Sequence, residues 1–256
     1  MPNYASKLGE AVGNAVEAEI QRIIKEAVEP YGLYVDVGGK RPGKRKGEKL
    51  LMVNDTGTEY QIDLAVENKA GEPFILVESK YIRYKKHNRD KASWTCVAHY
   101  KLRTTYPTIR KSIAILMGNW SEPSRKLMNS FGVEIVTIPF VEMVQVLADV
   151  GIDFNWAEDD NQTPKLSWQK WAELSNAQHT DIARQILANH ADKIRALIIS
   201  GIESEATPIE NVDRIELLLK TTQDEYHLKK FKSVRETIAY LLDLTADIDN
   251  IKGKLR

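Results

Sequence analysis

Three charged side chains on neighbouring segments of the sequence could carry out metal-dependent chemistry. Asp63 lies in the β-type run at residues 60–66, and Glu78 and Lys80 directly follow the apolar run at residues 74–77. Because side chains along a strand alternate between its two faces, Glu78 and Lys80 share one face. Carboxylates suit Mg²⁺, and a lysine beside them can orient or deprotonate a metal-bound water. If Asp63 faces the same way, the set predicts hydrolysis of phosphodiester bonds.

A hairpin is the element that would bring these residues together. Residues 68–73 are rich in turn formers and separate the two apolar runs, a pattern typical of two antiparallel strands. In an alternative interpretation, Glu78 and Lys80 form an exposed ion pair at a strand end, and Asp63 is a surface residue beside the turn.

These residues resemble the PD-(D/E)XK nuclease superfamily, which includes most Type II restriction endonucleases. Asp63 matches the aspartate of the motif and Glu78-Ser79-Lys80 matches its E-x-K element, whereas Ile62 stands where the motif has proline. The resemblance implies Mg²⁺, with Mn²⁺ as a substitute, held by Asp63, Glu78 and the backbone carbonyl of Ser79. It also implies that Lys80 positions the attacking water.

The predicted order of elements agrees with the same superfamily. A helical period over residues 5–28 is followed by strands at 33–37, 50–53, 60–66 and 74–77, and then by alternating helices and strands up to residue 149. The apolar run at residues 112–117 is typical of a buried parallel strand reached by a crossover helix. We therefore expect an α/β fold with a restriction-endonuclease-like αβββαβ core, in which helices flank a mixed sheet.

The first helix supplies a further candidate. In the superfamily, the helix before the sheet often contributes a glutamate to the metal site, and Glu17 lies beside the apolar stripe on a strip that also holds Gly13. Glu10 and Glu19 compete for this role, and most helix glutamates are simply solvated. His99, further along the chain, is expected to be structural rather than a general base.

Two basic segments are candidates for contact with nucleic acid. One is the glycine-rich segment at residues 38–49, and the other is the segment at residues 81–91, where basic residues alternate with aromatic ones. Such segments can neutralise phosphates, although most are solvated loops. The candidate nucleic-acid-binding residues are Lys40, Arg41, Lys44, Arg45, Lys46, Arg83, Lys85, Lys86 and Arg89.

The sequence changes character after residue 150. Residues 151–164 are acidic and polar and predict a linker, so residues 1–150 are expected to form the nuclease core. Residues 165–256 predict a mainly helical α+β region with a hairpin that turns at residues 222–224 and a last helix capped by Ser233. The roles considered for this region are dimerisation, packing against the core and DNA recognition.

Composition limits the classes of function. The 256 residues include 36 basic and 36 acidic side chains, so the formal net charge is zero and a surface for a polyanion must be local. Cys96 is the single cysteine, which excludes a disulfide within the chain. Without a signal-type segment or an apolar run of membrane-spanning length, we expect a cytoplasmic protein with no membrane contact.

The residues together with the resemblance therefore predict a Mg²⁺-dependent endonuclease, and the resemblance implies that it cuts double-stranded DNA as a Type II restriction enzyme. A homodimer and a cognate methyltransferase acting on the same site are the partners expected with it. The alternatives are a junction-resolving, repair or transposition nuclease, and a non-catalytic nucleic-acid-binding protein on the same fold.

Overall fold

The computed structural model describes residues 3–39, 50–84, 88–204 and 214–254, with no side chains described from residue 245 on. The chain divides into two compact units, Met1–Glu203 and Ser204–Arg256. These are called the first and second unit below, and each is considered by itself.

The first unit is built around a mixed sheet of five strands in the order β1-β4-β5-β6-β7. Strands β1, β4 and β5 pair antiparallel, whereas β5, β6 and β7 pair parallel. Every residue of β6 after Lys111 is buried, as expected for a central strand covered on both faces. The strands are β1 (Tyr34–Asp36), β4 (Leu64–Glu67), β5 (Pro73–Ile82), β6 (Lys111–Gly118) and β7 (Val133–Pro139).

Helix α1 (Tyr4–Val28) packs on one face of this sheet, in agreement with the helical period of the sequence. Its apolar stripe includes Leu8, Val12 and Val16, which are fully buried. The Asn3 side chain caps the helix by accepting a hydrogen bond from the Ser6 amide, which satisfies one of the unpaired N–H groups of the first turn.

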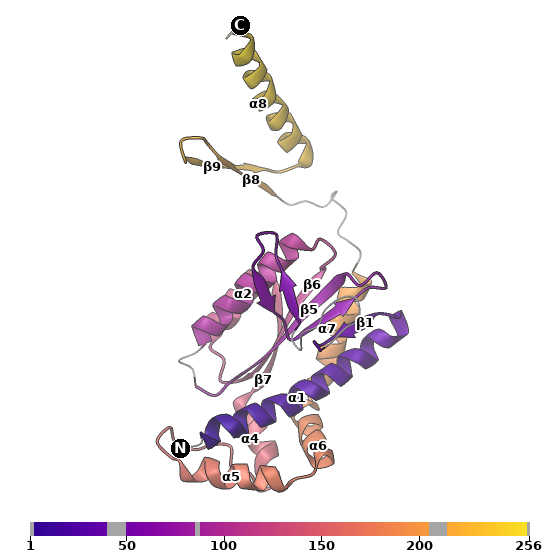
Figure 1. The fold of residues 1–256 in the computed structure, drawn as a ribbon, viewed down its shortest axis with the longest axis vertical. Coiled ribbons are helices and arrows are strands. Elements are labelled where there is room, and N and C mark those ends of the chain that lie inside the picture. Colours follow the sequence, from indigo (N-terminus) through magenta and orange to yellow (C-terminus); the bar gives the residue numbers. More distant parts are fainter. Residues whose placement is uncertain (1–2, 40–49, 85–87, 205–213, 255–256) are drawn as a thin grey trace. The chain divides into compact units, whose positions relative to one another are not determined.

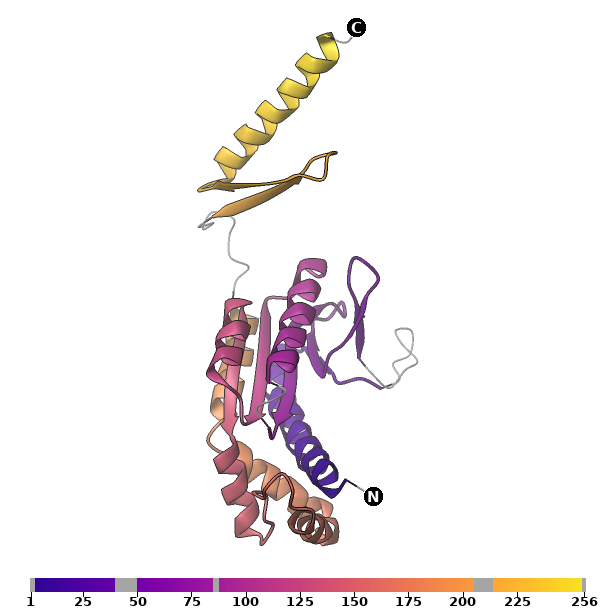
Figure 2. The same cartoon turned by 90° about the vertical axis from the view of Figure 1, so that its left-hand side faces the viewer.

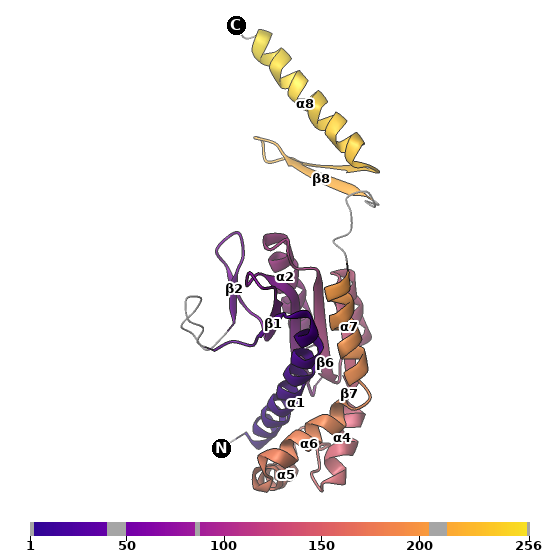
Figure 3. The same cartoon turned by 90° about the vertical axis from the view of Figure 1, so that its right-hand side faces the viewer.

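Three further helices extend the same apolar core and correct the predicted domain boundary. Helices α5 (Gln162–Glu173), α6 (Asn176–Leu187) and α7 (Ala191–Glu203) belong to the first unit, together with α4 (Phe140–Asp149). Figure 1 shows α5 and α6 beside α1, and α7 lies along the sheet, as Figure 3 shows. The boundary between the units therefore follows Glu203 and does not lie at residues 151–164.

The segment at residues 151–164 was predicted as a linker because of its acidic residues. Its first part instead alternates apolar and polar side chains, and Ile152, Phe154 and Trp156 are buried in the core that also contains α1. The acidic part then supplies a cap, because Asp160 Oδ1 accepts hydrogen bonds from the backbone amides of Gln162 and Thr163 at the start of α5.

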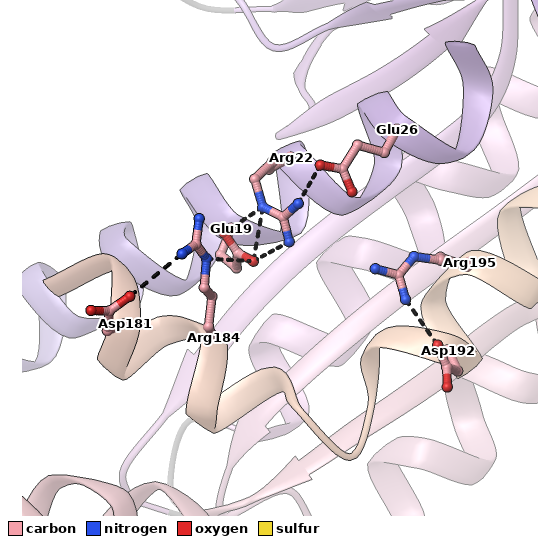
Figure 4. A network of polar contacts seen from close by, with 7 residues as sticks. All are labelled: Glu19, Arg22, Glu26, Asp181, Arg184, Asp192 and Arg195. Carbon is pink, nitrogen blue, oxygen red and sulfur yellow. Dashed lines mark hydrogen bonds and ion pairs between the residues drawn. The ribbon is translucent and has the colours of Figure 1, made fainter. Parts of the chain in front are cut away.

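A buried carboxylate fastens α1 to α6. Glu19 is only 4% exposed and accepts two hydrogen bonds from Arg22 Nε, at 2.9 and 2.8 Å. Arg184 of α6 also approaches Glu19, at 3.7 Å, and is itself 3.4 Å from Asp181, as Figure 4 shows. Because a buried charge must be compensated, this network fixes Glu19 on the side of α1 that faces α6.

Helices α2 (Asn88–Thr105) and α3 (Glu122–Ser130) cover the opposite face of the sheet. A separate hairpin of β2 (Leu51–Val53) and β3 (Glu59–Gln61) packs against α2, as Figure 2 shows. The sequence predicted a single strand over residues 60–66, but the structure divides it into β3 and β4. Cys96 is buried in the cluster between α2 and the sheet.

The second unit contains the predicted hairpin and last helix. Strands β8 (Ile215–Lys220) and β9 (Tyr226–Phe231) pair antiparallel, and α8 (Val234–Lys254) follows. The Ser233 hydroxyl accepts a hydrogen bond from the Glu236 amide, which confirms the predicted cap. The Phe231 and Tyr240 rings, 5.2 Å apart, pack the helix against the hairpin.

A chain shortened to end at Glu203 should fold without the second unit, because the first unit has a core of its own. We expect its melting temperature to lie within about 4 °C of that of the full chain. A chain ending at Asp149 should lose its cooperative transition, because it lacks α5–α7. Thermal melting followed by circular dichroism checks both chains, and a cooperative transition in the chain ending at Asp149 would contradict the observed boundary.

Candidate active site

Asp63 occupies the break between β3 and β4. Ile62 before it is buried in the cluster under α2, whereas Leu64 after it is buried in the core under α1. These two side chains anchor the backbone on opposite faces of the sheet, and Asp63 is fixed between them with its side chain 15% exposed.

Strand β5, which carries Glu78 and Lys80, extends beyond the end of its neighbour β4. The pairing of β4 with β5 begins at Leu64 and Val77, so β5 beyond Val77 is paired only with β6. The Ser79 amide donates a hydrogen bond of 2.8 Å to Asp63 Oδ2 across this open edge. Because the N–H and C=O of one strand residue point to the same edge, the Ser79 carbonyl is directed toward Asp63 as well.

Lys80 joins the two carboxylates. Its Nζ lies 2.9 Å from Asp63 Oδ2 and 2.6 Å from Glu78 Oε1. The Lys80 side chain is 26% exposed and that of Glu78 only 4%. The structure therefore brings together the three residues expected from the sequence, and their burial argues against an exposed ion pair at a strand end.

A tight turn holds the end of β5 in position. Gly118, at the end of β6, has a φ of 94°, and a Cβ there would lie 2.1 Å from the Ile82 carbonyl oxygen. This close approach allows the Asn119 amide to donate a hydrogen bond to that oxygen, at 2.8 Å. The Trp120 indole donates to the Lys80 carbonyl at 3.3 Å, so the backbone of Lys80 is also fixed.

The electrostatics of the three residues are strongly coupled. Burial alone would lower the pKa of Lys80, but Glu78 and Asp63 raise it overall, so the ammonium stays charged. Burial raises the pKa of Asp63, and repulsion from Glu78 adds to this effect. Burial also acts to raise the pKa of Glu78, but His99 and Lys80 beside it lower the pKa overall.

His99 is a neighbour that sequence reasoning did not assign to the site. It is fully buried on α2, and its Nε2 lies 4.0 Å from Glu78 Oε2, beyond hydrogen-bond distance. Both ring nitrogens and Glu78 Oε2 lack a hydrogen-bond partner among the described residues. The signal in the sequence is helical spacing, since Thr95 and Leu102 on the same face of α2 are also buried.

Glu17 of α1 also lies near Asp63 and Ser79. It borders a small cavity together with Asp63 and Ser79, and Gln21 Nε2 donates a hydrogen bond of 3.4 Å to its carboxylate. Burial raises the pKa of Glu17, and the nearby Asp63 raises it further. Of the two competitors, Glu19 is turned into the network with α6 and Glu10 is exposed.

The predicted nucleic-acid contacts are only partly described. Arg89 is exposed on α2, whereas Arg83 has a structural role that corrects its assignment. The Arg83 guanidinium donates hydrogen bonds to the carbonyls of Phe154 and Trp156, at 2.6 and 3.0 Å, and lies 3.7 Å from the centre of the Trp156 ring. The remaining candidates lie outside the described residues: Lys40, Arg41, Lys44, Arg45, Lys46, Lys85 and Lys86.

The donor set fits a hard divalent cation that retains several waters. Mg²⁺ is commonly held by one or two carboxylates, and Asp63, Glu78 and the Ser79 carbonyl are oxygen donors at one sheet edge. Glu78 Oε2 is a buried oxygen without a hydrogen-bond partner in the described residues. Among the described residues, no cluster of three or more His, Cys, Asp or Glu side chains is arranged to hold a metal ion.

Comparisons with known proteins add little to this geometry. No protein-family model matches the chain. No curated protein matches it. The crystal structure of a protein of unknown function, AF1548, is similar over 73% of this chain and 98% of its own, with 13% identity and a TM-score of 0.32, which is too low to carry an argument. None of the helices in the described residues has both the length and the apolar character needed to span a membrane.

Glu78→Gln should lower the free energy of unfolding by about 2 kcal/mol at pH 7, because it removes the ion pair with Lys80. The folded-state pKa of Glu78 lies below its unfolded value, so its stabilisation is present above about pH 4.3 and disappears as the pH falls further. Urea unfolding of both proteins at pH 7 and pH 3.5 should show the difference shrinking. A difference independent of pH would contradict this account.

Glu17→Gln should raise the free energy of unfolding by about 0.5 kcal/mol at pH 7, because Glu17 is half-buried and lies near Asp63. Its folded-state pKa is raised, so the ionised carboxylate destabilises the fold above that pKa and the gain disappears in acid. Urea unfolding measures the change, with Glu10→Gln on the exposed part of the same helix as the control. A destabilised Glu17→Gln protein would show that the carboxylate is structural.

Proposed function

We propose that this protein is a Mg²⁺-dependent endonuclease that hydrolyses phosphodiester bonds of double-stranded DNA. The observation that carries the proposal is the shared ammonium of Lys80, within 2.9 Å of both the Asp63 and the Glu78 carboxylates. Two carboxylates and a lysine on one sheet edge, with a third carboxylate from Glu17 beside them, are the groups that metal-dependent phosphodiester hydrolysis needs.

Asp63, Glu78 and the Ser79 carbonyl would hold the cation. When bound, the divalent cation supplies electrostatic stabilisation of the charge that develops on the phosphate. The Lys80 ammonium, fixed through its side chain and through its backbone carbonyl, orients the attacking water. Glu17, whose raised pKa favours proton uptake, accepts a hydrogen bond or a proton on the α1 side.

The order of elements supports the finer assignment to a restriction-endonuclease-like core. Helix α1 is followed in the main sheet by three antiparallel strands, β1, β4 and β5, and then by the crossover helix α2 and the parallel strand β6. This is the αβββαβ order that the resemblance implies. A restriction enzyme also implies a homodimer, a cognate methyltransferase, and products with 5′-phosphate and 3′-hydroxyl ends, all of which stay predictions.

Lys80→Ala should reduce cleavage of supercoiled and of unmethylated phage DNA in Mg²⁺ by at least about 100-fold, because the water loses its orienting group. Lys126→Ala is the matched control, since Lys126 is an exposed lysine paired within α3. Agarose gels with Mg²⁺, Mn²⁺ or EDTA give the readout. We expect discrete fragments with the wild type and Lys126→Ala in metal, and none in EDTA.

Full activity in Lys80→Ala would contradict the assigned role of the lysine. If the wild-type protein cuts none of these DNA forms in either metal but binds them in a salt-sensitive way, the non-catalytic alternative replaces the nuclease proposal.

A further inference from the structure

A wide cleft opens beside the candidate active site on the α1 side of the sheet. It has a volume of about 1430 Å³ and lies between the first half of α1, the end of β5 and helix α5. Glu17 and Ser79 line this cleft and also border the small cavity at Asp63. The cleft therefore adjoins the small cavity at Asp63, and it is larger than the roughly 300–1,000 Å³ of a small-molecule pocket.

The glycines of α1 that line the cleft have different surroundings. A Cβ on Gly9 would lie 3.2 Å from the Tyr81 ring, so close packing against this ring explains why residue 9 is a glycine. A Cβ on Gly13 would meet nothing within 4 Å. Glycine in a helix interior is less favourable than alanine, and at Gly13 no packing contact explains it. A functional need for the open space beside Gly13 would therefore explain why this residue is a glycine.

The charges of the lining do not suit a phosphate backbone. Among the described residues, its acidic and basic side chains nearly balance, and the Arg83 guanidinium is committed to the carbonyls of Phe154 and Trp156. Among the described residues the charged lining consists of Glu10, Glu17, Glu158 and Asp160 against Arg83, Lys91 and Lys165. Phosphates bind where basic groups predominate, so a polymer in this cleft would turn its phosphates outward.

The neutral part of the lining suits nucleobases instead. Aromatic rings provide stacking surfaces and side-chain amides can hydrogen-bond to base edges. The rings of Tyr4 and Tyr84 and the amides of Asn14, Gln162 and Gln169 line the cleft. The Tyr81 ring also lines the cleft, and its hydroxyl has no hydrogen-bond partner among the described residues.

We infer that this cleft binds the bases of an unpaired stretch of the nucleic-acid substrate, and that Gly13 keeps open the path of that strand to the active site. The inference rests on the proposed function, because it identifies the strand as substrate. It narrows the mode of binding to double-stranded DNA in which nucleotides next to the cut bond become unpaired.

The test compares three substitutions on α1. Gly13→Phe fills the open space, Gly13→Ala adds only a methyl group, and Ala18→Phe places the same ring on an exposed position outside the cleft. Fluorescence anisotropy in EDTA measures binding of a short fluorescein-labelled oligonucleotide, single-stranded or annealed to its complement. Circular dichroism melting verifies the fold, which we expect to be retained because Gly13 has space and both replacements favour helix.

We expect Gly13→Phe to weaken binding of the single strand about tenfold or more, as the loss of base stacking predicts, and the other two variants to stay within about twofold of the wild type. Single-strand binding by Gly13→Phe as tight as that of the wild type would overturn the inference.

The outcomes for the cleft and for the nuclease proposal are separable. If the wild type cuts DNA but Gly13→Phe binds the single strand normally, only the cleft assignment fails. If Gly13→Phe weakens single-strand binding but the wild type cuts no DNA, the cleft assignment stands and the nuclease proposal fails. A wild type that does not bind the single strand overturns the cleft assignment, whereas the nuclease proposal is decided by the cleavage test.

Discussion

The ion pair of Lys80 with two carboxylates is the interaction on which the rest of the site depends. Glu78 is almost fully buried and Asp63 largely so, and two negative charges at this depth would repel each other and lose hydration. The ammonium offsets both effects, and the amide of Ser79 adds a further donor to Asp63. The stability of this centre therefore relies on positive charge between the carboxylates.

The fold produces this centre by ending one strand early and extending its neighbour. Because β4 begins only at Leu64, the edge of β5 beyond Val77 is open, and the preceding Asp63 can reach across it. Helix α1 closes the arrangement from one side with Glu17 and is itself fixed by the buried network of Glu19 with Arg22 and Arg184. The core around α1, including α5–α7, thus supports the position of the third carboxylate.

Sequence patterns were informative where local rules decide the structure. The alternation in β5 placed Glu78 and Lys80 on one face, and the apolar period of α1 predicted its length and its packing. Patterns failed where tertiary contacts decide. Acidic residues 158–160 suggested a linker and hid the buried Ile152, Phe154 and Trp156, and the basic character of Arg83 suggested phosphate contact although its guanidinium binds two backbone carbonyls. His99 was expected to be structural, and its position beside Glu78 could not be predicted because that relation joins a helix to a strand distant in sequence.

The central claim is that Asp63 and Glu78 form a divalent-cation site, and calorimetric titration of Mg²⁺ into the metal-free protein tests it most directly. Asp63→Asn removes a carboxylate from the centre, and Asp192→Asn is the control because the Asp192 side chain is 99% exposed. The account predicts that the wild type and Asp192→Asn bind Mg²⁺ alike and that Asp63→Asn binds it at least about tenfold more weakly. Equal binding by Asp63→Asn, or no binding by the wild type, would contradict it.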